Sequence, residues 1–559
     1  MSHYSPAIYV PESTSRPRNA ATFLATVLLP TVGAVVFVVA LVQVLWLWQG
    51  TRGLFRDSDT GWHIRNGETI LTANRIPLTD SFSYTRPGAP WFAWEWLSDV
   101  LLGGTHRLAG TAGVAGLAAF AIAIAAWAVF RVALSFDANL FFAVGASALM
   151  LGTTSIHWLA RPHVFSWILS LAFIAVAEHE RRRSSRWLFA LPVVACLWAN
   201  LHGSFLMGPG ILFLYAAGNW IDRRSGLRFA AAALASLAAT FINPFGWHLH
   251  DHIFAYLANG YLMDHISEFR SFSFHSPGSI AVELFLLAAV FGLIAFVRQR
   301  MFGAALLTIG ILHMAMYSAR HLATAAVMLL PLSAAALTRE AGNWPKWRPM
   351  LRYSERLRAI DNSIWGIAPV VVALALTAVG LNAAGYSGSV GFDPAIFPIQ
   401  AAEVLTRANI TDRVFTKDQW GGYLIYRFNG ARKVFLDGRS DFYGQAMLEA
   451  YAEIADVKPG WNSVLRQYDI RYVMIPPDHA LASVLRMSPE WKPVYRDTVA
   501  VLFERCCAKI GTANSPPETG RGGQLWMTAL MTTPSAPAKE ASQLFLLGAS
   551  TPPLRGGEY

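Results

Sequence analysis

Two carboxylates stand two residues apart near the start of the chain, in the stretch RDSDTGWHIRNGE at residues 56–68. They are Asp57 and Asp59, and His63 follows shortly after them. Carboxylates and imidazoles are side chains that move protons in enzymes, provided that they reach the reacting group. Two neighbouring aspartates also permit Mg²⁺ or Mn²⁺ without requiring either ion. The alternative is that both acids only accept hydrogen bonds from the backbone of a loop.

Further polar side chains lie at the ends of apolar segments, where they are expected to join these acids. Ionisable groups close to hydrocarbon are costly and usually face a bundle interior or a wet cavity. Arginine can hold a phosphate through paired hydrogen bonds, and histidine or glutamate can assist. Each histidine alone is better interpreted as a hydrogen-bonded interfacial residue, so the prediction depends on the whole group. The candidates for holding a phosphate, or a group attached to it, are Arg161, His163, His202, Glu268, Arg320 and His321.

The composition indicates which elements must position these residues. Of the residues, 54% are hydrophobic and only 14% are charged, whereas soluble domains carry about 25% charged residues. Long apolar runs therefore predict membrane spans. The formal charge of +10 comes from lysines and arginines clustered in short loops. Such clusters set membrane orientation, so the charge gives little reason to expect a nucleic-acid partner.

We predict about eleven transmembrane helices from the length and apolarity of the runs. The stretch 94–107 is short and polar, and its tryptophans favour a place at the membrane surface. The predicted spans are 22–49, 110–133, 139–159, 162–180, 187–201, 203–221, 228–243, 279–298, 301–318, 320–338 and 363–386.

The loops between these spans predict the orientation. With eleven crossings, all the basic segments fall on one side, which the positive-inside rule makes the cytoplasm. The N-terminus, 1–21, is then cytoplasmic, and the first outer loop, 50–109, carries the two aspartates on the extracytoplasmic side. The basic segments are Arg16 with Arg18, 181–186, 222–228, 298–300 and 346–358.

After the last span the pattern changes to alternating short strands and helices, which predicts an extracytoplasmic α/β domain over 392–505. The expected strands lie in DRVFTKD, RKVFLDG, IRYVMIPP and TVAVLFE, and the expected helices in PIQAAEVLTRA and GQAMLEAYAEIA. The tail, 511–559, is rich in Pro, Gly, Ser and Thr, which predicts disorder. Three cysteines are too few for a disulfide framework.

This domain has candidates of its own. The glycines of DQWGGYLIYRF, 418–428, suggest turns at a surface. The stretch LDGRSD contains Asp437 and Arg439, which could bind a sugar or cap the cavity. A turn held by aspartate side chains is an equally open interpretation.

The run from FRDSDTGWHIRNGETIL to WFAWEWLSDVLLG resembles the first outer loop of bacterial membrane proteins with a GT-C-type glycosyltransferase fold. The runs WGGYLIY and VFLDGRSDFYG resemble the C-terminal part of uncharacterised bacterial members of that superfamily. The resemblance covers roughly residues 20–505. It implies a multi-pass protein of the bacterial cytoplasmic membrane, with its N-terminus in the cytoplasm and its C-terminal domain outside.

The resemblance also implies a reaction. A sugar carried on a polyprenyl phosphate would pass to a lipid, glycan or protein acceptor, with inversion at the anomeric carbon. Asp59 is the first choice for the acid that contacts the acceptor and Asp57 the second, with His63 assisting. Some relatives use a divalent metal and others do not. The chain lacks the paired Asp-Glu run of protein mannosyltransferases and the WWD-type signature of oligosaccharyltransferases, which puts a protein acceptor in doubt.

Two other functions remain open at this stage. A GT-C-like scaffold would bind a lipid-linked glycan during envelope assembly without catalysis. A transporter or flippase would carry its polar groups near the membrane midplane, often on inverted repeats. The polar groups here lie at one face and no internal repeat is evident, so transport is the weaker alternative.

Overall fold

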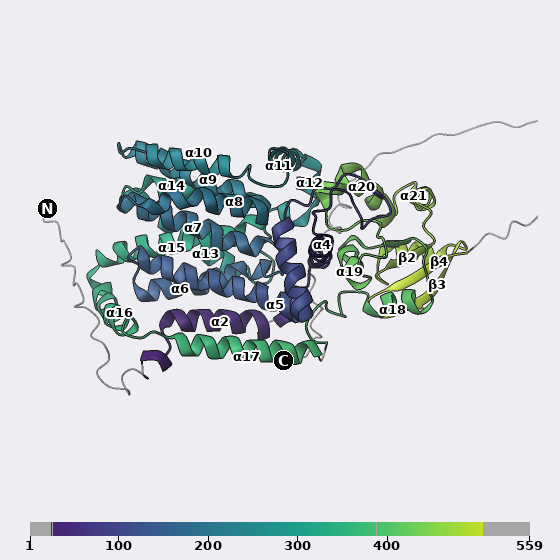
Figure 1. The fold of residues 1–559 in the computed structure, drawn as a ribbon, viewed down its shortest axis with the longest axis horizontal. Helices are drawn as coiled ribbons and strands as arrows, with labels where there is room; N and C mark the ends of the chain where they lie inside the picture. The colour runs from purple at the N-terminus through teal and green to yellow at the C-terminus, as the bar shows by residue number, and fades with distance from the viewer. Residues whose placement is uncertain (1–23, 25, 48, 387, 507–559) are drawn as a thin grey trace, which may run out of the picture.

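The computed structural model describes residues 24, 26–47, 49–386 and 388–506 of the chain. A long helical bundle carries a small domain with a sheet at one end (Figure 1). The segment 1–21, for which we predicted a cytoplasmic location, lies outside the described residues. The tail 511–559, for which we predicted disorder, also lies outside them. The helices of the bundle and of its loops are α2 Val32–Trp46, α3 Gly50–Leu54, α4 Asp59–Ala73, α5 Trp96–Ser135, α6 Leu140–Thr154, α7 His163–Arg182, α8 Leu191–Leu201, α9 Met207–Ile221, α10 Leu227–Ala239, α11 His248–Ala258, α12 Gly260–His265, α13 Ser279–Arg298, α14 Phe302–Tyr317, α15 Arg320–Gly342, α16 Arg348–Asp361 and α17 Ile367–Tyr386.

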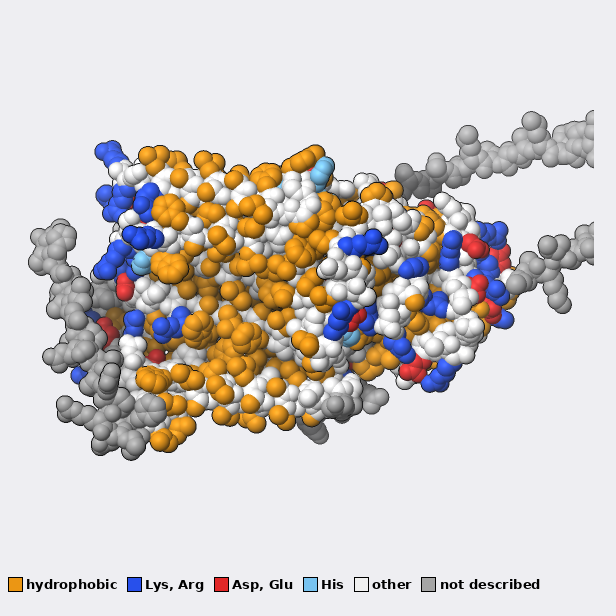
Figure 2. All heavy atoms as spheres, in the orientation of Figure 1, with side chains coloured by type: hydrophobic (Ala, Val, Ile, Leu, Met, Phe, Trp, Pro, Cys, Tyr) orange, Lys and Arg blue, Asp and Glu red, His pale blue; other side chains and the backbone are white. Residues whose placement is uncertain are grey.

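Seven helices of the described chain are long and apolar enough to cross a membrane. Three shorter apolar helices accompany them, at Arg186–Leu201, Leu227–Ala239 and Phe302–Tyr317. Apolar side chains cover much of the visible flank of the bundle (Figure 2). The protein is therefore a multi-pass membrane protein. The count of eleven spans stays a prediction.

Basic residues gather at the end of the bundle that lies away from the C-terminal domain (Figure 2). Contacts link the described basic loops there. Arg182 binds Asp137, Arg228 binds Glu180, and Arg298 lies 3.6 Å from Glu340. The predicted arrangement of basic loops on one side therefore matches the fold.

The segment 94–107, for which we predicted a place at the membrane surface, is mostly helical. It forms the first part of α5, which breaks at Ala109 and Gly110, where Gly110 has a φ of 59°. The first part lies across the end of the bundle (Figure 1). One of its faces is nevertheless buried, including Ser98 and Asp99, because α4 packs on it. Glycine permits the left-handed conformation at which the chain turns.

The C-terminal domain, for which we predicted the bounds 392–505, contains a four-stranded sheet in the order β1-β2-β4-β3. β1 and β2 are parallel, and the remaining pairs are antiparallel. Three of the four predicted strands are present, but RKVFLDG forms only an isolated bridge between Val434 and Ser83. β3 and the helices α19, α21 and α22 were not predicted. The elements are α18 Ile399–Arg407, β1 Val414–Thr416, α19 Asp418–Arg427, α20 Ser440–Ala455, α21 Trp461–Gln467, β2 Tyr472–Ile475, α22 Ala480–Met487, β3 Trp491–Arg496 and β4 Val501–Arg505.

The prediction of surface turns at DQWGGYLIYRF was wrong, because these residues form helix α19 and pack against α4. A Cβ added at Gly61 would lie 2.2 Å from the carbonyl oxygen of Gly422. A Cβ added at Gly422 would lie 2.2 Å from the carbonyl oxygen of Ser58. The glycines therefore let two helix backbones touch, which fixes the C-terminal domain on the helix that carries Asp59.

Candidate active site

Helix α4 brings the first group of polar residues onto one face. Asp59, His63, Asn66 and Ile70 follow the spacing of one helix face, and all four are buried. Asp59 occupies the first turn, where the positive end of the helix dipole favours a carboxylate. Asp57 lies just before the helix and accepts a hydrogen bond from the Asp59 backbone N–H at 2.9 Å.

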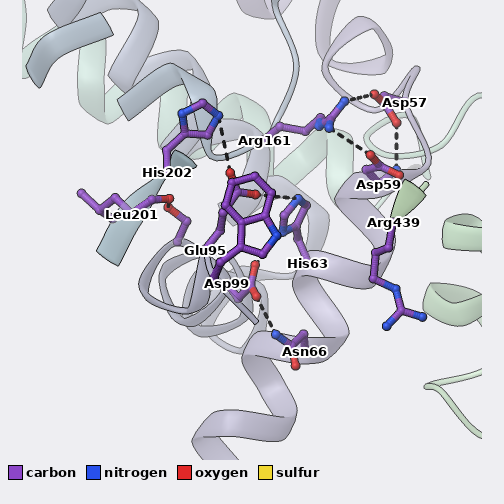
Figure 3. A network of polar contacts seen from close by, with 12 residues as sticks. Asp57, Asp59, His63, Asn66, Glu95, Asp99, Arg161, Leu201, His202 and Arg439 are labelled. Atoms are coloured by element: carbon purple, nitrogen blue, oxygen red, sulfur yellow. Dashed lines mark hydrogen bonds and ion pairs between the residues drawn. The ribbon is translucent and has the colours of Figure 1, made fainter. Parts of the chain in front are cut away.

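Arg161 is the centre of the site. Its Nη1 donates to Asp57 Oδ2 at 2.5 Å, and its Nη2 lies 3.0 Å from Asp59 Oδ2 (Figure 3). The Nη1 group also donates to Glu268 Oε1 at 3.1 Å. The arginine comes from the short connection between α6 and α7, and Glu268 from the loop before α13. Three carboxylates remote in sequence thus share one guanidinium. Arg320, at the start of α15, lies 4.0 Å from Glu268 and over the ring of Phe269.

A second network adjoins the first and centres on Glu95 (Figure 3). Glu95 Oε2 lies 3.8 Å from His63 Nε2, and Oε1 lies 3.4 Å from His202 Nε2. The other ring nitrogen of His63 lies 2.5 Å from Asp99 Oδ1, and Asn66 donates to Asp99 Oδ2 at 2.5 Å. His63 is thus oriented by Asp99, and its Nε2 faces Glu95.

Burial and neighbouring charges set the protonation of these groups. Burial, reinforced by the negative charge of Asp57, raises the pKa of Asp59 despite the opposing effect of Arg161. Burial alone would also raise the pKa of Glu268, but Arg161 and Arg320 hold it below its usual range. Burial raises the pKa of Glu95 to about 7 and lowers the pKa of His63 to about 3. His63 is therefore neutral at neutral pH, whereas the carboxyl group of Glu95 titrates close to neutral pH.

Two pockets meet at these networks, and both are lined by Glu95, Arg161 and Arg320. The empty space within the first pocket, including its part open to solvent, is about 610 Å³, and that within the second is about 510 Å³. Asp59 lines the second pocket. Of the predicted donor-binding residues, those that line the first pocket are Arg161, His163, His202, Glu268, Arg320 and His321.

The histidines of the first pocket also have structural partners. His163 Nε2 lies 2.8 Å from the carbonyl oxygen of His157. His202 Nδ1 contacts the hydroxyls of Ser166 and Ser204 at 2.9 Å and 2.8 Å, and caps the short helix that follows it. Each of these two histidines is thus held by hydrogen bonds in the pocket wall.

Asp437 and Arg439 form a hydrogen-bonded turn at a pocket, and sugar binding by them stays a prediction. Arg439 donates two hydrogen bonds of 2.7 Å to Asp437 and one of 2.9 Å to Asp80, and Asp437 accepts from the Arg439 backbone at 3.1 Å. The turn is therefore held by an aspartate. Arg439 also lines the second pocket, and a Cβ at Gly438 would lie 1.9 Å from Asp59 Oδ1. The same turn thus lies directly against Asp59.

The aspartates do not form a metal site as they stand. Arg161 and the Asp59 backbone occupy both oxygens of Asp57, and Arg161 also binds Asp59. Within the described ranges, no three side chains of His, Cys, Asp or Glu are grouped to hold an ion.

Sequence reasoning missed Glu95, Asp99 and Asn66 as site residues. Glu95 and Asp99 belong to WFAWEWLSD, where acids interrupt an aromatic, apolar run. Buried acids in such runs are costly unless they have partners, which is the signal that could have identified them. Asn66 could be recognised only from its position on the same face of α4 as His63, and we did not predict this helix.

The fold is that of the GT-C glycosyltransferases, as the sequence resemblance implied. Over 79% of this chain and 69% of the other, it matches the archaeal oligosaccharyltransferase AglB from Archaeoglobus fulgidus in complex with an inhibitory peptide and a dolichol-phosphate, with a TM-score of 0.51 at 12% identity. At this identity the match establishes the fold alone.

A second similar structure is ArnT from Cupriavidus metallidurans in the apo state. The match has 15% identity and a TM-score of 0.47, over 84% of this chain and 96% of the other. The same protein bound to undecaprenyl phosphate matches over 85% and 97% at 12% identity, with a TM-score of 0.42. No protein-family model matches the chain, and no curated protein sequence does.

Proposed function

We propose that the protein is a membrane glycosyltransferase that transfers a sugar from a polyprenyl-phosphate donor to a lipid, glycan or protein acceptor. The observation that carries this proposal is the position of Asp59, in contact with Arg161 and in the wall of a pocket that Arg320 also lines. An acid beside two cations suits the activation of an acceptor hydroxyl next to a departing phosphate. The dolichol-phosphate bound by AglB, which shares the fold, supports a lipid-linked phosphate donor.

The proposal includes an orientation. The end of the bundle with the basic loops would face the cytoplasm, and the site and the C-terminal domain would face outward from a bacterial cytoplasmic membrane. A lipid phosphate at the outer surface would then lie at the depth of the first pocket, with its chain in the bilayer. The N-terminus would be cytoplasmic, with eleven crossings before the C-terminal domain.

The chemistry follows from the contacts. Asp59 accepts the proton of the acceptor hydroxyl, whose oxygen attacks the anomeric carbon of the sugar with inversion. The bond from that carbon to the phosphate oxygen breaks, and the phosphate leaves with the electron pair. Arg320 is better placed than Arg161 to stabilise the leaving phosphate, because three carboxylates already bind Arg161.

The remaining candidates position these groups. Asp57 holds both Arg161 and the start of α4. His63 orients Glu95 rather than contacting the substrate, because Asp99 binds its other ring nitrogen. Glu268 places Arg161 and Arg320 side by side at the first pocket.

Donor binding and donor turnover, measured separately, test this function. The purified protein in lipid nanodiscs is given a panel of radiolabelled polyprenyl-phosphate sugars with lipid, glycan and peptide acceptors. We expect Asp59→Asn to lower turnover by about 10²–10⁴-fold while donor binding is retained. The matched control is Asp412→Asn, at a partly exposed aspartate of the C-terminal domain that lies 3.6 Å from Arg471.

The outcomes separate the alternatives. Donor binding without turnover in the wild type, with acceptors supplied, would favour the non-catalytic scaffold. If no donor bound at all, the glycosyltransferase proposal would fail, and a transporter or flippase would be tested next.

A further inference from the structure

The second pocket is built from several segments that are remote in the sequence. Trp62 of α4 and the stretch 91–94 of the loop before α5 supply four aromatic rings. Tyr256 of α11 supplies a fifth ring. The turn 438–441 of the C-terminal domain forms another part of the wall.

Hydrogen bonds hold the C-terminal turn over this pocket. Trp94 Nε1 donates to Asp441 Oδ2 at 3.2 Å, and His252 Nε2 lies 3.0 Å from the same oxygen. Tyr256 Oη lies 3.0 Å from Ser440 Oγ. The C-terminal domain therefore completes a pocket that the membrane-spanning bundle and its first loop leave open.

The charges of this pocket differ from those of the first. Two of its three arginines are already neutralised, because Arg161 binds Asp57 and Asp59 while Arg439 binds Asp437 and Asp80. Its wall also contains Glu95, Asp99 and Asp441. The donor phosphate is proposed to bind in the first pocket. Another phosphate, placed in the second pocket, would meet more carboxylates than free cations. The first pocket shares Arg161 and Arg320 with the second but is lined by fewer carboxylates, Glu95 and Glu268.

Aromatic faces combined with carboxylates suit one class of ligand. Rings bury an apolar surface without needing a charge on the ligand, and carboxylate oxygens accept hydrogen bonds from hydroxyl groups. A pyranose ring offers both, with C–H groups on its faces and hydroxyls at its edge. An extended peptide bound by strand addition would instead need the backbone of an exposed strand edge, and none of the strands of the C-terminal sheet lines this pocket.

We infer that the second pocket is the acceptor subsite and that it takes a neutral sugar ring, so that the acceptor is a glycan or glycolipid rather than a protein. This inference rests on the proposed function. The pocket shares Asp59 with the reacting centre and Glu95, Arg161 and Arg320 with the first pocket. A sugar hydroxyl in it would lie next to Asp59 and face a donor held in the first pocket.

Binding of a simple glycoside tests this without requiring turnover. Saturation-transfer NMR is recorded on the full-length protein in nanodiscs with methyl β-glucopyranoside and, separately, with a neutral peptide of serine, threonine and alanine. We expect transfer to the pyranoside ring protons in the wild type, and a decrease by about fivefold or more in Trp94→Ala, because one stacked ring is lost.

Three further variants keep the test decisive. Trp94→Phe retains a ring and should keep the signal. Trp247→Ala removes an exposed tryptophan at the start of α11 that lines neither pocket, and should also keep it. Should Trp94→Ala fail to fold because Trp94 packs on Gly203, Tyr256→Ala replaces it.

The inference is overturned if the wild type gives no pyranoside signal, if Trp94→Ala and Trp247→Ala behave alike, or if only the peptide binds. Donor turnover measured on the same preparations separates the two proposals. Turnover without glycoside binding refutes the acceptor subsite and leaves the transferase. If glycoside binding is lost only in Trp94→Ala while the wild type shows no donor turnover, the sugar pocket is supported and the proposed transfer reaction is refuted.

Discussion

Two arginines in this protein each bind more than one carboxylate, yet their surroundings differ. Arg161 binds Asp57, Asp59 and Glu268, and its side chain is 16% exposed in the wall of both pockets. The Arg439 side chain is 2% exposed. It binds Asp437 and Asp80 and lies over several aromatic rings. Arginine–carboxylate pairing therefore lies at the wall of the proposed active site at Arg161, whereas at Arg439 it attaches the C-terminal domain to the first loop.

Exposure and charge balance explain the difference. Arg439 is matched by two carboxylates inside an aromatic enclosure, an arrangement that joins the first loop to the C-terminal domain. Arg161 faces an excess of carboxylates, which raises the pKa of Asp59 together with its burial. Excess charge at a pocket wall is costly to folding and useful to acid–base chemistry.

The largest effect is expected from Arg439→Met. The substitution leaves Asp437 and Asp80 buried without a cation, which should lower the free energy of unfolding by about 3–5 kcal/mol. Chemical denaturation in detergent, monitored by circular dichroism, measures it. Arg407→Met, at an exposed helical ion pair, is the control and should change stability by less than about 0.5 kcal/mol. A small change in the free energy of unfolding in Arg439→Met would contradict the structural role that distinguishes Arg439 from Arg161.

The next effect is expected from Arg161→Lys, measured as activity. A lysine keeps the charge but cannot bridge three carboxylates, because it lacks the planar fork of arginine. We expect sugar transfer to fall by about 10²-fold, with a smaller loss of stability than at Arg439. Unchanged transfer with strongly reduced stability would show that Arg161, too, is only structural.

A smaller effect is expected from Gly422→Ala. The added methyl group would meet the carbonyl oxygen of Ser58, and overpacking of this kind costs about 1–3 kcal/mol. Thermal unfolding gives the stability change. Gly210→Ala, where nothing lies near the added Cβ, is the control. Equal stability of the two variants would contradict the close contact of α4 with α19.

The finest test concerns the pH dependence of transfer. The negative charge of Asp57 raises the pKa of Asp59, and Asp59 acts as a base only when deprotonated. Asp57→Asn removes that charge, so the pKa of Asp59 falls and the rise of activity with pH moves to lower pH. The profile of kcat/KM against pH measures the shift. A shift to higher pH would exclude this electrostatic coupling.

The sequence predicted the bundle, the basic end and most of the C-terminal strands, because these depend on local apolar patterns and charges. It also identified Asp57, Asp59, Arg161 and Glu268, which the structure brings together. Ionisable residues beside apolar runs are conspicuous in a membrane protein.

The remaining features depend on partners that local patterns do not reveal. Asp80 was not selected, because its pairing with Arg439 joins segments at opposite ends of the chain. RKVFLDG has a strand-like pattern, but its neighbour is the first loop rather than the sheet, so only one bridge forms. The glycines of α19 suggested turns because their packing against Gly61 is a tertiary effect.

The backbone contact between α4 and α19 has a consequence for precision. Where side chains separate two elements, rotamer changes can alter the spacing between them. Here Gly61 lies against the carbonyl group of Gly422, so no side chain of either residue stands between the two helices. The spacing between Asp59 and the turn 438–441 is therefore fixed by backbone contact, and it can vary only as much as the two backbones can move.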